Sequence, residues 1–320
     1  MGWKRKLATG ITLISASTAA IHMINKIIYF SATLDNLLSN PSGSYYEWKF
    51  GKVYYTAKGQ GKPLLLIHDL NTYSSGYEWH DIISELSKNN TVYCIDLLGC
   101  GRSDKPNLTY TNYLYVQLID DFIKHVIGSK TDIIATGESA AIAIAACQNN
   151  QSIIDKILMV NPLTLNTLER IPSKRTKILA KLINFPVIGT FLYNMLTKKK
   201  DIEDLFHNKF FYDFHNVESS LINTYYETAH SSVSSSKYLF ASLVGHYTTV
   251  NLKHCLEKLT NSIYIINGKE RDESESISKE YENILPSIES IYIDKSNYLP
   301  QLERSKEFID QVKIFLEDDF

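Results

Sequence analysis

The chain has 320 residues and nearly balanced charge, with 33 Lys and Arg against 35 Asp and Glu and a net charge of −2 at pH 7. This length fits one large domain or two small ones, and the charge balance argues against a nucleic-acid-binding protein, which usually carries a basic face. The 44% hydrophobic content is ordinary for a globular protein with a core. The four cysteines lack CxxC or histidine-rich spacing, so we expect neither a metal site nor a disulfide framework. We also expect no cofactor.

The first residues combine a basic cluster with an uncharged stretch. Lys4, Arg5 and Lys6 precede residues 7–25, which are roughly long enough to cross a bilayer as a helix. We predict that residues 1–34 form an uncleaved, single-pass membrane anchor, with residues 7–25 in contact with the membrane. The basic cluster then places the N-terminus inside and the main domain outside the cytoplasm. A cleaved signal peptide and an amphipathic helix lying on the membrane are the alternatives.

After a polar linker at residues 35–44, short apolar runs alternate with helical patterns. The alternating residues 45–50 and 52–56 predict an antiparallel hairpin. Continuous apolar runs predict strands buried on both faces, at 63–68, 92–96, 132–136, 156–161, 262–267 and 290–294. Helical patterns lie between them, at 77–86, 113–127, 140–148, 274–284 and 305–316. This order predicts an α/β fold with a mainly parallel sheet and helices on both faces.

One interval departs from this alternation. Residues 163–260 contain no convincing buried strand and are rich in Lys, Tyr, Phe and His at helical spacing. We predict that they form a helical lid, and that the core consists of residues 45–162 and 261–320. A lid over the open side of a parallel sheet commonly controls substrate choice and excludes water.

Ser139 follows an apolar β-branched run and precedes an alanine-rich helical pattern. A strand, a tight turn and a helix with Ser at the apex form a nucleophile elbow. Gly137, Ala140 and Ala141 are small enough for the two backbones to approach closely there. The alternative interpretation is a serine that only caps a helix.

Four segments, in order, resemble the α/β-hydrolase superfamily in its lid-bearing serine hydrolase branch. Residues 64–70 are similar to a strand and oxyanion loop, and Asp96-Leu97-Leu98-Gly99-Cys100-Gly101-Arg102-Ser103 is similar to the Asp-x-x-Gly-x-Gly-x-Ser loop of that family. Residues 137–141 are similar to its elbow, and residues 296–303 to the loop that carries its catalytic histidine. The resemblance covers the chain from about Tyr45 onwards and implies an α/β-hydrolase fold.

The resemblance also implies roles for individual residues. Ser139 would be the nucleophile, and the oxyanion hole would be formed at Asp69, Leu70 and Ala140. In the loop after strand 262–267, Asp272 is the first candidate for the acid and Glu270 the second, while Arg271 interrupts the usual spacing. The histidine position is filled by Asn297, which cannot exchange a proton near neutral pH as a histidine does. His68 has a structural role by the same resemblance.

Two functions remain open on these residues. The first is a membrane-anchored serine hydrolase of small apolar ester or acyl substrates, with an impaired or atypical triad. In that case a lid histidine could replace the missing base, the candidates being His207, His215, His230, His246 and His254. The second is a catalytically inactive pseudoenzyme that serves as a binding or scaffolding module. Asp69, Arg271 and Asn297 favour the second, because each weakens one component of acyl-transfer chemistry.

Overall fold

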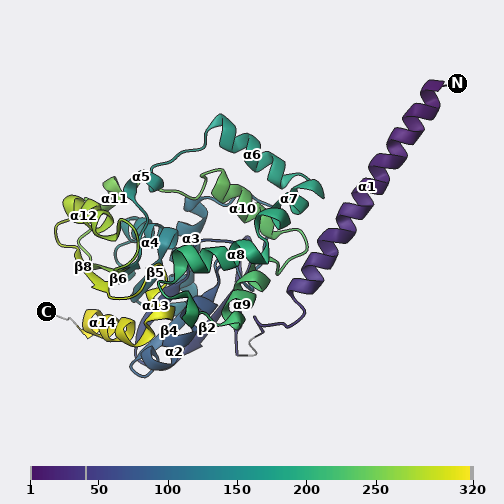
Figure 1. Ribbon diagram of the computed structural model, residues 1–320. Coiled ribbons are helices and arrows are strands. Elements are labelled where there is room, and N and C mark those ends of the chain that lie inside the picture. Colours follow the sequence, from purple (N-terminus) through teal and green to yellow (C-terminus); the bar gives the residue numbers. More distant parts are fainter. Residues whose placement is uncertain (1, 40–41, 318–320) are drawn as a thin grey trace.

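An eight-stranded sheet forms the centre of the protein, seen in a computed structural model that describes residues 2–39 and 42–317. The strand order is β1-β2-β4-β3-β5-β6-β7-β8 (Figure 1). The strands are β1 (Ser44–Trp48), β2 (Gly51–Lys58), β3 (Lys62–Ile67), β4 (Asn90–Ile95), β5 (Thr131–Thr136), β6 (Ile154–Val160), β7 (Ile263–Gly268) and β8 (Glu289–Ile293). β2 pairs antiparallel with β1 and β4, and all other neighbouring strands are parallel. The predicted hairpin and mainly parallel sheet are confirmed.

Helices cover both faces of this sheet, as the sequence predicts. One face packs on α3 (Asn112–Phe122), α4 (Gly137–Asn149) and α12 (Ser274–Ile284), and the other on α2 (His80–Leu86) and α14 (Ser305–Glu317). Central strands such as β3 and β5 are apolar along their length because both of their faces are buried. Three short helical segments complete the core, namely η1 (Gly76–Trp79), η2 (Ile123–Ile127) and α13 (Pro300–Glu303).

Between β6 and β7 every regular element is helical, in the interval predicted as a lid. The elements are α5 (Leu165–Leu168), α6 (Lys174–Asn184), α7 (Ile188–Leu196), α8 (Lys199–Leu205), η3 (Phe206–Phe210), η4 (Phe214–Asn216), α9 (Ser219–Ala229), α10 (Ser236–Val244) and α11 (Lys253–Leu256). An apolar cluster that includes Phe206, Phe210 and Tyr225 packs against Leu299, in the loop before α13. We call residues 163–260 the lid, because this cluster holds them over the loop segment that also carries Asn297.

The N-terminal segment forms one long helix, α1 (Gly2–Ala32), which projects from the body of the protein (Figure 1). Its C-terminal half is attached to the lid. The Asn25 side chain donates to the Val187 carbonyl and accepts from the side-chain amide of Asn194. The side chains of Lys4 and Arg5, part of the predicted basic cluster, lie outside the described residues. Among the described residues, no single helix combines the length and apolar character needed to cross a membrane. The structure therefore does not support the predicted spanning helix at residues 7–25.

The loop after β4 is held by an ion pair that is almost completely buried. Both carboxylate oxygens of Asp96 accept hydrogen bonds from the Arg102 guanidinium, at 2.7 and 2.9 Å, and the Arg102 and Gly76 amides also donate to them. Arg102 holds the pKa of the Asp96 carboxyl below its usual range. Gly101 lies at φ +47°, where a Cβ would overlap this carboxylate. The glycine-rich motif of this loop therefore closes a turn around a buried charge.

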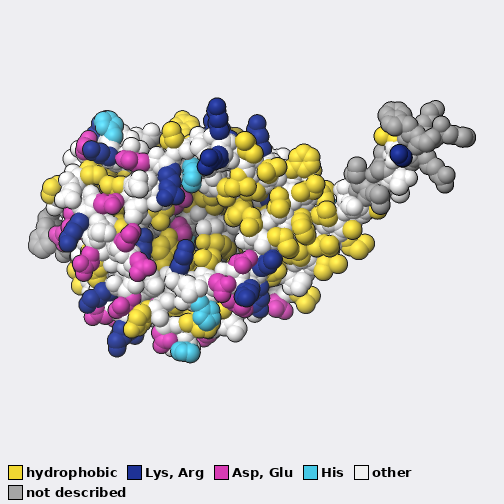
Figure 2. Space-filling view, turned by 45° about the horizontal axis from the view of Figure 1, so that its top comes forward, with side chains coloured by type: hydrophobic (Ala, Val, Ile, Leu, Met, Phe, Trp, Pro, Cys, Tyr) yellow, Lys and Arg dark blue, Asp and Glu magenta, His cyan; other side chains and the backbone are white. Residues whose placement is uncertain are grey.

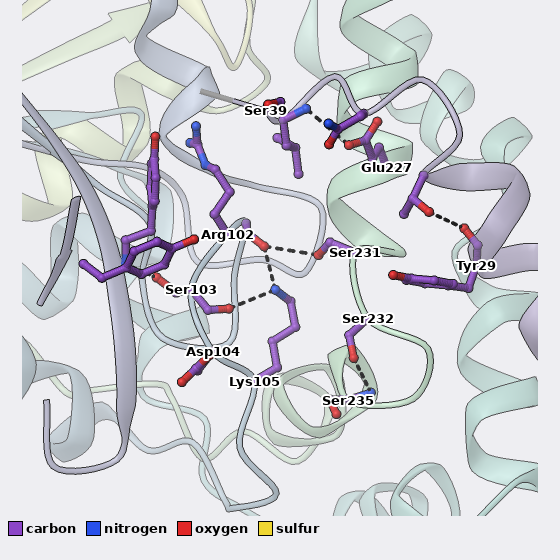
Figure 3. A pocket seen from close by; sticks show the side chains of 16 residues that line it. Tyr29, Ser39, Arg102, Ser103, Asp104, Lys105, Glu227, Ser231, Ser232 and Ser235 are labelled. Carbon is purple, nitrogen blue, oxygen red and sulfur yellow. Dashed lines mark hydrogen bonds between the residues drawn. The ribbon is translucent and has the colours of Figure 1, made fainter. Parts of the chain in front are cut away.

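The linker after α1 is tied to the lid by Glu227 of α9. The Leu37 and Leu38 amides donate to its carboxylate at 2.8 and 3.2 Å, and Glu227 is buried. A polar cavity of about 580 Å³ opens beside this contact, between Tyr29 of α1 and the loop at Lys105. The Ser231 hydroxyl and the Lys105 ammonium, both labelled in Figure 3, donate to the Gly101 carbonyl. The lid thus has hydrogen bonds both to the linker and to the loop after β4.

We expect Glu227→Ala to release the linker. Hydrogen bonds to a charged group each contribute about 1.5–3 kcal/mol to stability. Without the two Glu227 acceptors, the buried Leu38 side chain is the main remaining attachment of residues 33–39. Limited proteolysis should then cut this segment faster than in the wild type. Asp204→Ala, an exposed acid of α8, is the matched control and should leave the rate unchanged. Equal cleavage rates in wild type and Glu227→Ala would contradict this role.

Candidate active site

The sharp turn between β5 and α4 has Gly137 at its apex. β5 ends at Thr136, α4 begins at Gly137, and only Gly137 within this turn has a left-handed backbone, at φ +57°. A nucleophile elbow holds its catalytic residue at this strained position, directly between strand and helix. Gly137 has no side chain, and a Cβ built on it would overlap the Tyr298 hydroxyl and the Asp69 carboxylate. The apex therefore carries no nucleophile, and neighbouring groups fill its space.

Ser139 lies two residues further on, inside α4, which corrects the expected position of the elbow. Its exposed fraction is 0%, and its Oγ has no hydrogen-bond partner in the described structure. The serine faces the core because a residue two positions along a helix is rotated away from the apex by more than half a turn. The strand, turn and helix are thus present as expected, but the serine is not at the apex.

Asp69 occupies the place where an oxyanion would bind. In a nucleophile elbow the oxyanion hole consists of the amide after the apex and an amide of the loop after β3. Here the Glu138 amide donates to Asp69 Oδ1 at 3.0 Å, and the Leu70 amide lies close enough to lower the pKa of this carboxyl. The donor expected at Ala140 is instead the Glu138 amide, because Glu138 directly follows the apex at Gly137 and Ala140 lies three residues beyond it. The protein's own carboxylate therefore fills its oxyanion hole.

Tyr298, rather than Asn297, reaches the apex. The Tyr298 hydroxyl donates to Asp69 Oδ2 at 3.0 Å. Asn297 is instead fixed by its backbone, whose amide donates to Glu303 and whose carbonyl accepts from Asn161. The described contacts therefore bring Tyr298, the neighbour of the predicted position Asn297, to the apex. A phenol that stays protonated, as burial here ensures by raising the pKa of Tyr298, cannot act as the base near neutral pH.

Arg271 faces Tyr298 where the acid is expected. Its guanidinium lies 5.3 Å from the centre of the Tyr298 ring and donates to Asn161 Oδ1 and the Pro162 carbonyl. Asp272, the first candidate for the acid, is exposed, and so is Glu270. Neither of them has a hydrogen bond to Tyr298 in the described structure. A cation thus stands where acyl transfer would use a carboxylate to orient its base.

The histidines have structural roles where their contacts are described. His68 is fully buried, with Nε2 accepting from the Leu97 amide and Nδ1 bonded to the Asp69 carbonyl. This pattern fixes the neutral tautomer with its proton on Nδ1, and burial lowers the pKa of His68. Within the lid, His230 is buried and bonds the Tyr226 carbonyl and Thr197. The other lid histidines, His207, His215, His246 and His254, have no hydrogen bond to Ser139 in the described structure, whose Oγ has no partner.

Three carboxyl groups surround the apex, of which Asp69 and Glu78 are buried and Glu138 is partly buried. Burial raises the pKa of Asp69 above its usual range, although amide, phenol and Arg271 interactions oppose the shift. Burial likewise raises the pKa of Glu78 to about 8 and that of Glu138 to about 7. Glu78 accepts from the Asp69 amide and from Gln301, so it supports the loop that carries Asp69. No three His, Cys, Asp or Glu side chains in the described residues are placed to hold a metal ion.

A cavity of about 320 Å³ lies directly above these groups, between the sheet and the lid. Core residues form its polar floor and lid residues most of its apolar wall. Its lining consists of Asp69, Leu70, Asn71, Tyr73, Glu138, Leu163, Leu205, Lys209, Phe210, Leu243 and Tyr298. The side-chain oxygen Glu138 Oε1 is buried and makes no well-formed hydrogen bond in the described structure, although the Thr248 hydroxyl lies close enough to lower the pKa of Glu138. The cavity thus offers an incompletely satisfied acceptor inside a mainly apolar wall.

Sequence reasoning missed the roles of Gly137 and Tyr298. A glycine directly after a buried strand is a signal for a left-handed residue, because glycine adopts positive φ without steric cost. Tyr298 is the first large polar side chain before Pro300, which begins α13. A polar residue just ahead of a helix-starting proline stands at the end of a loop, where a side chain can reach a neighbouring strand end.

Comparison with known proteins supports the fold and the general family. A profile described as "Alpha/beta hydrolase family" matches residues 64–311. A soluble epoxide hydrolase from Corynebacterium sp. (strain C12) is 24% identical over 110 residues, which cover 34% of this chain and 38% of that protein. The chain thus aligns with well under two thirds of that relative's length.

Two solved structures share the fold across most of the chain. A meta-cleavage product hydrolase from Pseudomonas fluorescens IP01 has a TM-score of 0.70 at 19% identity, covering 87% of this chain and 98% of its own. A membrane phospholipase A has a TM-score of 0.68 at 17% identity, covering 98% of both chains. At these identities the likeness concerns the fold alone. Because the family profile spans more than half of the sequence, the chain belongs to the alpha/beta hydrolase family.

Proposed function

We propose that this protein binds a small, mainly apolar molecule in the cavity above Asp69 and forms no acyl-enzyme at its elbow. The observation that carries the proposal is the Asp69 carboxylate, which accepts from the Glu138 amide of the oxyanion hole while Gly137 leaves the apex without a nucleophile. A fixed carboxylate repels a developing oxyanion, whereas a catalytic site places donors there. The function is thus that of a hydrolase-family binding module.

The cavity favours a ligand with a hydrogen-bond donor or a positive charge. Its apolar wall, which includes Leu163, Leu205 and Phe210, suits a hydrocarbon body. Glu138 Oε1 is buried and makes no well-formed hydrogen bond, and an unsatisfied buried acceptor costs about 1–3 kcal/mol, which a bound donor would recover. A small apolar amine satisfies both features, and a carboxylate would meet Asp69 and Glu138 unfavourably.

Thermal unfolding with two matched probes tests this proposal. At pH 8, where Glu138 with its pKa of about 7 is mostly ionised, benzylamine should raise Tm in a saturable way and benzoate should not. The shift should diminish at pH 6 and in Glu138→Gln, while the surface control Glu85→Gln should keep it. A larger shift with benzoate, or an equal benzylamine shift in Glu138→Gln, would contradict the proposed ligand class.

Hydrolysis of small apolar esters is the second candidate. It is favoured by the relatives, which are described as an epoxide hydrolase and a meta-cleavage product hydrolase. It would require Ser139 to leave its buried position in α4 and to find a base. Turnover of a panel of nitrophenyl esters above the uncatalysed rate, abolished by Ser139→Ala, would support this candidate and exclude the binding-only function.

We also propose that the chain associates with a membrane through α1. The basic residues before the uncharged stretch 7–25 support this, and one structural neighbour is described as a membrane phospholipase A. An orientation with the main domain outside the cytoplasm follows from the same basic cluster. Recovery of the full chain in the membrane fraction of expressing cells is expected, and recovery only in the soluble fraction would contradict the association.

A further inference from the structure

Exposed apolar side chains gather where α1 meets the lid. They lie on the C-terminal half of α1, on α6 and on α7, and Figure 2 shows them as one continuous surface at the base of the projecting helix. The exposed fractions are 65% for Phe30, 53% for Leu182 and 58% for Phe185. A soluble monomer rarely exposes so continuous an apolar area unless it serves as an interaction surface. We call this surface the α1–α6–α7 face.

The connection between α6 and α7, residues 185–187, exposes part of this face. α6 meets the helical stretch that begins with α7, Ile188–Phe210, at a bend of 108°, with residues 185–187 at the break. Val187 has a left-handed backbone at φ +60°, which is costly for a β-branched residue. Asn25 of α1 holds the Val187 carbonyl at 3.2 Å, so α1 supports the strained joint. Phe185 and Ile188 flank the bend and are exposed.

Positive charge accompanies the apolar side chains without any negative charge. Residues 171–200 contain seven Lys and Arg and no Asp or Glu. Four of these cations lie on α6, beside the exposed Ile178, Leu179 and Leu182. A helix with an apolar face and flanking cations is the pattern of a segment that lies in the interface of an anionic bilayer.

We propose that the α1–α6–α7 face docks on a lipid bilayer that carries anionic headgroups, with Ile178, Leu182 and Phe185 inserted below the headgroups. This proposal rests on the membrane association proposed above and names the lid surface that takes part in it. The four cations of α6 decide against a second copy of the chain, since a twofold interface would place this positive part of the face against itself. An anionic headgroup layer is complementary to the same cations.

Fluorescence at single positions of the full chain tests the docking. A Leu182→Cys variant carries the environment-sensitive dye NBD on the face, and Ile314→Cys carries it on an equally exposed apolar position of α14. With vesicles of phosphatidylcholine and phosphatidylglycerol, emission at position 182 should increase at least twofold and shift to the blue, and doxyl-labelled lipid should quench it. Emission at position 314 should stay unchanged. Vesicles of phosphatidylcholine alone should give a smaller response at position 182.

Co-sedimentation of the same samples separates the two membrane proposals. If the protein sediments with vesicles while NBD at position 182 does not respond, α1 alone associates and docking of the lid is overturned. If the protein does not sediment, the membrane association itself fails. A response at position 182 without vesicles that grows with protein concentration identifies a second copy as the occupant, and also overturns the proposal. Replacement of Ile178 and Phe185 by Ser should reduce the response at position 182 at least twofold.

Discussion

Asp96→Ala should destabilise the protein by about 3–5 kcal/mol, the usual cost of removing one partner of a buried ion pair. Asp96 is fully buried, and its carboxylate accepts hydrogen bonds from the Arg102 guanidinium and amide and from the Gly76 amide. Without it, the Arg102 charge stays largely buried and loses its counter-ion. Urea denaturation at pH 7 measures the difference in the free energy of unfolding.

The control for this prediction is an exposed ion pair in which an aspartate pairs with a lysine. Lys269 and Asp294 approach to 2.6 Å at the surface. Because solvent screens such a pair, Asp294→Ala should leave the urea midpoint unchanged. A similar midpoint shift in both variants would show that burial does not govern the cost at Asp96.

Glu78→Gln should change how stability depends on pH. The pKa of Glu78 is about 8 in the folded protein, well above its usual value of 4.5. Between these two pH values the folded state holds a proton that the unfolded state has released. The wild type therefore loses about 1.4 kcal/mol of unfolding free energy per pH unit as the pH rises through this window. Glu78→Gln has no titrating group at this position, so its unfolding free energy lacks this contribution to the pH dependence.

Urea denaturation at pH 5, 6, 7 and 8 checks the Glu78 prediction. The stability of Glu78→Gln relative to the wild type should grow steadily across the series, reaching several kcal/mol by pH 8. Glu85→Gln is the matched control, since Lys313 and Lys88 lower the pKa of Glu85 to about 2 and no growing difference is expected above pH 5. A constant difference between Glu78→Gln and the wild type would contradict the raised pKa.

The sheet could be predicted from the sequence because its signals are local. β3 and β5 are short apolar runs, and every predicted core strand lies within two residues of an observed one. Which residue stands at the apex of the elbow could not be predicted in this way. Small residues occupy alternate positions on both sides of Gly137, so the pattern fits more than one alignment. The residue at which β5 ends determines which residue stands at the apex. Thr136 still pairs with Val160 of β6, a contact distant in sequence.

The position of Tyr298 also depends on contacts that are distant in sequence. Glu303 accepts from the Asn297 amide and, through its other oxygen, from the Tyr212 and Asp213 amides of the lid. These contacts turn the loop so that Tyr298, not Asn297, points at the elbow. In the sequence, the resemblance of residues 296–303 to the family's histidine loop favoured Asn297.

The apolar face at α1, α6 and α7 shows a further limit of sequence reasoning. The sequence indicated a membrane contact at residues 7–25, whereas the exposed apolar side chains continue onto the lid at α6 and α7. Lys, Tyr and Phe at helical spacing indicated only a lid. Whether such a helix turns its apolar side inward or outward depends on the packing of its neighbours, which a single sequence does not reveal.

The central claim is that the elbow has no nucleophile and that Asp69 occupies its oxyanion hole. Mass spectrometry of the full chain after treatment with a fluorophosphonate probe tests this claim most directly. We predict no adduct on the peptide that contains Ser139, both in the wild type and in Ser139→Ala, under conditions in which an active serine hydrolase is fully labelled. A stoichiometric adduct at Ser139 that disappears in Ser139→Ala would contradict the account.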